Sequence, residues 1–285
     1  MAGLGRFPED PSALELRRSD LAGAWYPGNP AALRETIDAF FDGVPSQPLN
    51  GKLRALVAPH AGYQFSGPTA AYSYKQVVGG SYDAVVVVGP SHRLPFGDYA
   101  IAAEAAYWTP LGAVPLAQDL IAQLARAVPV TRVREAEEHS IELQLPFLQM
   151  ALGRFQLVPI LMSVDDLGRC IRLGEALALL ARERHILLVA STDLNHLPSY
   201  ESVRKRDADV VSALEGFDLP VMASVLLAPA YTVCGRAPLL AVSAAAQALG
   251  ATEVHVLHYT NSGDVTGRVT EGTYTVGYLS AAITT

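Results

Sequence analysis

Charge is sparse in this sequence, and positive charge is the rarer sign. Only 17% of the residues are charged, and 21 Lys and Arg stand against 28 Asp and Glu, for a formal net charge of −7. A surface that binds nucleic acid or an anionic membrane needs clustered Lys and Arg to neutralise phosphate. The acidic balance therefore argues against nucleic acid and against membrane as partners.

Long apolar runs and cysteines are also lacking. No apolar run approaches the roughly 20 residues of a membrane-spanning helix, and the opening MAGLGRFPEDPSALELRR has no apolar stretch typical of a secretory signal. Cys170 and Cys234 are the 2 cysteines, too few for a disulfide framework and suited to a reducing compartment. We therefore expect a cytoplasmic protein.

Several common motifs and dividing features are missing as well. The chain has no Gly-x-Ser-x-Gly elbow, no Walker loop and no Gly-x-Gly-x-x-Gly after a strand. It also has no internal repeat, no low-complexity tract and no linker long enough to divide it. Half of its residues are hydrophobic, enough for a substantial core. We expect a single domain over 1–285, with 1–17 as a less ordered N-terminal extension.

Apolar runs alternate with stretches of helical spacing along the chain. The runs that indicate buried strands are 53–58, 83–88, 155–161, 185–190 and 254–258; the helical stretches are 30–42, 66–78, 116–127, 140–152, 166–183, 201–215 and 236–249. Such strands are typical of a mostly parallel sheet. Shorter alternations over 99–114 and 273–283 predict antiparallel additions. The expected fold class is α/β, a mostly parallel central sheet with helices on both faces.

Polar side chains follow three of these strands. His60 comes just after the run LRALVA, and His92 just after DAVVVVGP. The run HILLVA is followed by STDLNH, which carries Asp193 and His196. Parallel strands end at one edge of a sheet, where open α/β folds bind ligands. If these strands are near neighbours, their polar endings meet at one edge, although a single histidine after a strand is more often an ordinary loop residue.

Two imidazoles at one edge suggest a transition metal. Imidazole suits iron, copper, zinc or nickel, whereas magnesium and calcium prefer oxygen. A third, anionic ligand is needed, and two candidates exist. Asp193 would complete a two-histidine, one-carboxylate face, whereas Cys234 lies just before an apparent helix, whose N-terminus would lower the pKa of its thiol. A free cysteine is more often a small buried hydrophobe, so the residues alone leave this choice open.

The remaining histidines and the second cysteine are read from their surroundings. His139, near the start of a predicted helix, is either a site residue or a polar cap. His185 precedes a strand and is expected at the surface. His255 and His258 lie three apart in one strand and are expected on opposite faces. Cys170 falls on the apolar side of a helix and is expected in the core.

The motifs together resemble one known family. The segments are LAGAWYPGNPAAL, VAPHAGYQFSGPTAAYSY, VVVVGPSHR, EEHSIELQLPFLQ, STDLNHLPSY, VCGRAP and SGDVTGRVTEGTYTVGY, in order from about Arg18 to Ser280. They closely resemble the Memo family, whose prokaryotic members are called AmmeMemoRadiSam system protein B. The resemblance implies a fold similar to that of the class III extradiol dioxygenases, which use non-haem Fe(II) and O₂ to split catechol rings.

The resemblance also implies roles for individual residues. His60 and His92 correspond to the iron-binding histidines of the dioxygenases, and Cys234 takes the place of their glutamate ligand. Asp193 and His196 fall beside the metal, with His196 matching the acid/base histidine, and His139 lines the same pocket. A thiolate in place of a carboxylate is a soft, oxidisable donor, so the likeness implies a metal site without implying ring cleavage.

Three functional hypotheses follow. The first is a non-haem Fe(II) oxidoreductase acting on a small substrate, phenolic by analogy, with O₂, in which His196 moves protons and Asp193 orients it; copper and zinc are the alternative metals. The second is a non-catalytic adaptor that binds a peptide or protein partner, such as other members of the AmmeMemoRadiSam system, and keeps a vestigial metal pocket. The third is a zinc-dependent hydrolase.

Overall fold

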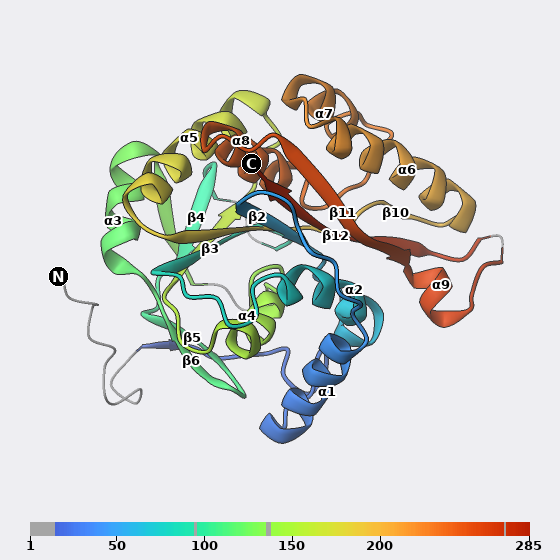
Figure 1. The fold of residues 1–285 in the computed structure, drawn as a ribbon, viewed down its shortest axis with the longest axis horizontal. Coiled ribbons are helices and arrows are strands. Elements are labelled where there is room, and N and C mark those ends of the chain that lie inside the picture. Colours follow the sequence, from blue (N-terminus) through green and yellow to red (C-terminus); the bar gives the residue numbers. More distant parts are fainter. Residues whose placement is uncertain (1–14, 94–95, 135–137, 271) are drawn as a thin grey trace.

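The computed structural model describes residues 15–93, 96–134, 138–270 and 272–285. Its main sheet has the strand order β10-β12-β2-β9-β3-β8-β4-β7, with β11 paired to β12 (Figure 1). These strands are β10 (His196–Leu197), β12 (Thr275–Thr284), β2 (Leu53–Ala58), β9 (Ile186–Ser191), β3 (Ala84–Pro90), β8 (Leu157–Met162), β4 (Tyr99–Ala102), β7 (Val130–Val133) and β11 (Glu253–Asn261).

The centre of this sheet is parallel and its margins are mixed. Strands β2, β9, β3 and β8 run parallel to one another, whereas β12 is antiparallel to β2, and β4 is antiparallel to β8. Every residue of β3, β8 and β9 is buried. A smaller sheet joins β1 (Leu16–Arg17), β5 (Ala106–Thr109) and β6 (Gly112–Pro115). The expected mostly parallel central sheet is confirmed.

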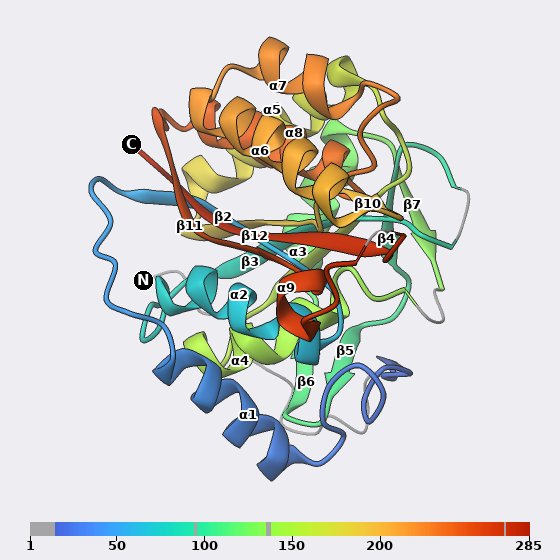
Figure 2. The same ribbon diagram turned by 90° about the vertical axis from the view of Figure 1, so that its right-hand side faces the viewer.

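Helices cover both faces of the sheet, as expected. One layer contains α1 (Pro30–Asp42), α2 (Tyr63–Lys75) and α4 (Leu145–Leu152); the other contains α5 (Leu167–Glu183), α6 (Tyr200–Gly216), α7 (Leu219–Leu226) and α8 (Arg236–Ala248) (Figure 2). Helix α3 (Gln118–Ala127) contacts α5, and α9 (Ser262–Thr266) contacts β11 and β12. Within the described residues, no helix is both long and apolar enough to cross a bilayer.

Local chemistry explains several helix boundaries. The Asn29 side chain accepts hydrogen bonds from two backbone N–H groups of α1, and Pro30 occupies its first turn. Asp166 and Ser199 cap α5 and α6 in the same way. Helix α2 begins at Tyr63, three residues before the predicted start. Pro68 therefore lies beyond its first turn.

The structure corrects three further details of the prediction. Helix α7 and strand β7 were not foreseen. A β-bulge between Val256 and His258 shifts the register, so His255 and His258 pair with Ala282 and Ser280 and share a face. Residues 1–14 of the expected N-terminal extension lie outside the described residues, but Leu16 and Arg17 form β1, and Arg17 is buried. The single-domain organisation stays a prediction.

Candidate metal centre

The strands that carry the predicted site residues are adjacent in the sheet. Strand β9 lies between β2 and β3 and is parallel to both. Their carboxyl ends therefore deliver His60, His92 and Asp193 to one edge. The expectation that the three polar endings meet is confirmed.

His60 is held by a hydrogen bond that fixes which of its nitrogens carries the proton. Its Nδ1 lies 2.8 Å from Oγ of Ser191, the last residue of β9. The Ser191 hydroxyl has a single proton, which it donates to the carbonyl oxygen of Ser140 at 2.5 Å. Ser191 must therefore accept from His60 Nδ1–H, which leaves the Nε2 of His60 with a lone pair. Burial, followed by the neighbouring histidines, lowers the pKa of His60 well below its ordinary value, so the ring is neutral.

His92 is fixed in the same tautomer by a carboxylate. Its Nδ1 lies 3.1 Å from Oε1 of Glu138, and its backbone N–H donates to Oε2 at 2.7 Å. Burial by itself would raise the pKa of Glu138, but the hydrogen bonds from His92 outweigh burial and lower it to about 2. Because the carboxylate only accepts, Nδ1 of His92 donates, and in the neutral ring its Nε2 keeps a lone pair. A carboxylate behind a histidine is a common arrangement at metal sites.

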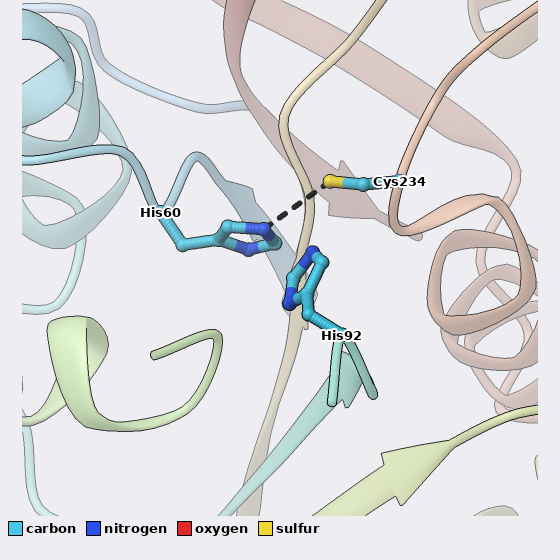
Figure 3. A group of neighbouring side chains, drawn as sticks. All are labelled: His60, His92 and Cys234. Carbon is cyan, nitrogen blue, oxygen red and sulfur yellow. Dashed lines mark hydrogen bonds between the residues drawn. The ribbon is translucent and has the colours of Figure 1, made fainter. Parts of the chain in front are cut away.

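Cys234 reaches these imidazoles from a different layer, through the loop that precedes α8. Its Sγ lies 3.2 Å from His60 Nε2. The dashed line in Figure 3 marks this contact. Gly235 makes this approach feasible, since a Cβ there would lie 2.4 Å from Cβ of Thr192. The sequence had suggested a lowered pKa for this thiol, and the structure shows the opposite. Burial, and then the nearby Asp193, raise the pKa of Cys234 above its ordinary value.

Ligand atoms of His60, His92 and Cys234 all lie within 4.8 Å of one another. A tetrahedral ion with bonds of about 2.0–2.3 Å keeps its ligand atoms about 3.5 Å apart, so modest side-chain movement lets the three share one ion. Ligand atoms of His92, Glu138 and His139 also lie within 4.8 Å of one another. There, however, Glu138 Oε1 already lies at hydrogen-bonding distance from His92 Nδ1 and from the backbone N–H groups of His139 and Ser140.

Asp193 is buried beside the three ligand candidates without joining them. Its Oδ1 accepts the backbone N–H of His60 at 2.7 Å. Burial raises its pKa to about 7, partly offset by that hydrogen bond. Its carboxylate therefore fixes the His60 backbone. The expected hydrogen bond from Asp193 to the His196 ring is not found among the described residues. Of the two anionic candidates, the sulfur of Cys234 is the one found within 4.8 Å of ligand nitrogens of both His60 and His92 among the described residues.

His196 and His139 also border the site. The Nε2 of His196 is buried and has no hydrogen-bond partner among the described residues. The His139 ring stacks on that of His92, with centroids 4.3 Å apart, and meets His60 edge-on at 5.3 Å. Burial, followed by the electrostatic influence of His92, lowers the pKa of each ring to about 4. Of the two readings of His139, the site residue is the one that this geometry favours.

Sequence reasoning missed the residues that support the ligands. Glu138 directly precedes His139 in the EHS motif, and Ser191 opens STDLNH, so both lie in motifs that also carry predicted site residues. Trp25 was missed too; its ring lies 4.6 Å from that of His139 and is 37% exposed. The signal that could have found Glu138 is a carboxylate beside a candidate site histidine. His185 is exposed and Cys170 is buried, as predicted.

A family model described as Memo-like protein matches residues 17–282. The chain belongs to the Memo-like family. A MEMO1 family protein of Methanopyrus kandleri is 36% identical to it over 278 residues, covering 93% of this Memo-like chain and 97% of the relative. A MEMO1 family protein of Methanosarcina acetivorans is 32% identical, covering 95% and 100% of the two chains.

The fold of the Memo-like chain is also found in a solved structure. The crystal structure of an uncharacterized protein from Escherichia coli K12 matches with a TM-score of 0.55 and 21% identity, covering 81% of this chain and all of that one. At that identity the likeness concerns the fold alone. The family prediction is thus confirmed, whereas the likeness to ring-cleaving dioxygenases stays a prediction.

Proposed function

We propose that the protein is a metal-dependent oxidoreductase that holds Fe(II) with His60, His92 and Cys234. The observation that carries the proposal is the convergence of two imidazole rings, each with its Nδ1 engaged by another partner, and one sulfur, with ligand atoms within 4.8 Å of one another. Imidazole and thiolate together suit iron, copper and zinc, and do not suit magnesium or calcium. The donor set therefore fits a transition metal.

The residues behind the ligands fit the same purpose. Ser191 and Glu138 each accept a hydrogen bond from an Nδ1–H group, so both histidines can bind the ion through Nε2 without changing tautomer. Such outer partners orient metal ligands and raise their basicity. When bound, the ion would supply a Lewis acid and a one-electron redox centre for the reaction of a small, phenolic substrate with O₂.

His196 supplies a proton acceptor at the border of the site. Its buried Nε2 has no hydrogen-bond partner among the described residues, so in the tautomer that carries the proton on Nδ1 it would accept from a substrate hydroxyl placed there. The backbone of His196 is held by Thr232, whose Oγ1 accepts its N–H at 2.8 Å. Asp193 holds the His60 backbone, and His139 forms a wall of the site beside His92.

Anaerobic reconstitution with Fe(II) tests the proposal. The wild-type protein should retain one equivalent of iron after desalting and consume O₂ when a catechol is added. His92→Ala should lose at least about 100-fold in iron affinity, because it removes a ligand along with its lone pair. His185→Ala is the matched control, because His185 is an exposed histidine stacked on Tyr82. It should behave as the wild type.

Other outcomes point to the other functions. Tight binding of zinc without O₂ consumption would replace the proposal by hydrolysis at a metal-bound water. Capture of a peptide or protein partner that survives His60→Ala, with no turnover, would favour an adaptor. Retention of full metal affinity by Cys234→Ser, with unchanged spectra, would transfer the anionic role to Asp193. Failure of the wild-type protein to take up any transition metal would refute the metal centre altogether.

A further inference from the structure

A buried carboxylate lies on helix α6, which contacts strands β10 and β12 of the main sheet. Asp207, on the inner face of α6, is fully buried. Its Oδ1 accepts the backbone N–H of Asn195 at 3.0 Å and the side-chain amide of Asn195 at 2.8 Å, and its Oδ2 accepts the hydroxyl of Tyr259 at 2.9 Å. Gly277 in β12 makes room for it, because a Cβ there would lie 1.9 Å from Oδ2.

Asn195 passes this constraint on to the loop of Cys234. While its amide nitrogen donates to Asp207, its amide oxygen accepts the backbone N–H of Thr232 at 2.8 Å. The Thr232 hydroxyl in turn accepts the N–H of His196 at 2.8 Å and donates to the His196 carbonyl at 3.1 Å. Two segments of the site are thus joined, because Asn195 precedes His196 and Thr232 stands two residues before Cys234.

The cost of burying Asp207 points to a role in placing these segments. A buried charge is expensive even when it is hydrogen-bonded, and an apolar side chain of similar volume often stabilises a fold as well or better. A leucine in this position could fill space but could not hold Asn195. Both hydrogen bonds to Oδ1 of Asp207 come from Asn195, the residue that connects the two site segments.

We infer that Asp207 is a positioning residue for the metal centre, acting through Asn195 and Thr232 to fix Cys234 and His196 relative to each other. The inference rests on the proposed function, since it concerns how the thiolate ligand is placed. The two imidazole ligands come from β2 and β3 and have their own supports, Ser191 and Glu138. Loss of Asp207 should therefore weaken the sulfur ligand while sparing the histidines.

Cobalt(II) alone is the probe that separates sulfur from nitrogen ligation. A thiolate bound to Co(II) gives an intense charge-transfer absorption, which histidine ligands do not give. Titration of the metal-free, reduced full-length protein then reports both affinity and the intensity of this band per bound ion. In Asp207→Ala we expect an affinity lower by about tenfold or more, with a weakened band, as for other outer partners of metal ligands.

Two further variants make the test independent of folding. Asp207→Asn keeps an oxygen that can accept both bonds from Asn195, so it should restore most of the affinity and the band. Thr232→Val keeps the shape of an exposed residue and removes the bonds to the His196 backbone, and should lower the affinity by about threefold, the worth of a typical hydrogen bond. The matched control is Glu215→Ala, because Glu215 is an exposed carboxylate near the other end of α6. It should match the wild type.

The outcomes distinguish this inference from the proposed function. A wild-type protein that binds no Co(II), or binds it without the thiolate band, refutes the function and this inference with it. A wild-type protein with the band, together with an unchanged band and affinity in Asp207→Ala and Thr232→Val, overturns only the inference. Should Asp207→Ala fail to fold by circular dichroism, Thr232→Val decides, and an unchanged band there counts against the positioning role.

Discussion

Single hydrogen bonds decide the chemistry of this site at the scale of the residue. The Ser191 hydroxyl has a partner for its only proton in the Ser140 carbonyl, so it can serve His60 only as an acceptor. The His92 ring reaches the same state through the ionised Glu138. The two imidazoles thus differ in their support: His60 relies on a neutral hydroxyl and His92 on a charge.

Ser191→Ala should therefore lower metal affinity without removing a ligand. Without the hydroxyl, the proton of His60 is no longer directed to Nδ1, and we expect a loss of about 10–100-fold, typical of outer partners. Isothermal titration with Co(II) or Fe(II) measures it. Ser224→Ala is a suitable control, because Ser224 is an exposed serine that donates to a backbone carbonyl within α7. Equal affinities for both variants would show that Ser191 does not set the tautomer.

At the scale of the element, close contact between α5 and α8 shapes the helical layer that follows the Cys234 loop. Helix α5 packs on α8, the helix that follows the Cys234 loop, and their backbones approach at Gly174. A Cβ at this glycine would lie 2.6 Å from Cβ of Ala244 and 2.8 Å from the carbonyl oxygen of Ala241. Glycine on α5 and the alanine-rich sequence of α8 therefore set the distance between these helices.

Gly174→Ala should lower the free energy of unfolding by about 1–3 kcal/mol, because an added methyl group overpacks this contact. Urea unfolding at neutral pH measures the change. Gly216→Ala is the matched control, since Gly216 ends α6 and a Cβ added there would meet nothing within 4 Å. There we expect a gain of about 0.4–1 kcal/mol through the lower entropy of the unfolded chain. Similar effects at both glycines would contradict the close approach of α5 and α8.

Buried tyrosines couple the stability of the whole molecule to alkaline pH. Burial raises the pKa of Tyr99 to about 12, with Asp98 as the next contribution. Burial is also the largest cause of the raised pKa of six further tyrosines, namely Tyr26, Tyr63, Tyr74, Tyr82, Tyr259 and Tyr278. Folding thus keeps these hydroxyls protonated at a pH where the unfolded chain would release the protons.

We therefore expect the free energy of unfolding to fall as the pH rises above about 10, the ordinary tyrosine pKa. Below that value both states are protonated and this contribution is complete; above it the unfolded state binds fewer protons, so stability declines up to the raised pKa values. Tyrosinate absorbance and far-ultraviolet circular dichroism, followed together, measure the transition. Ionisation of all tyrosines near pH 10 with the fold intact would contradict the prediction.

The sequence by itself determined the elements, the fold class and most of the candidate site. A run such as DAVVVV predicts a buried strand because its consecutive side chains are apolar, and this feature can be read from the local sequence alone. The histidines at the ends of two such runs, and the motifs shared with the Memo-like family, marked His60, His92 and Cys234. Short elements such as α7 show too few turns of helical periodicity to be predicted. The β-bulge near His258 could not be foreseen, because a regular alternation of residues assumes that no residue is inserted.

Only the tertiary structure decided the proton positions, the place of the thiol and the links between loops. His60 and Ser191 are 131 residues apart in the sequence, and His60 and Cys234 are 174 apart. Periodicity describes which face of an element is buried, but not which hydroxyl or sulfur a distant segment brings to that face. Hydrogen bonds act over about 3 Å, so their partners are set by the packing of strands and helices and not by order along the chain.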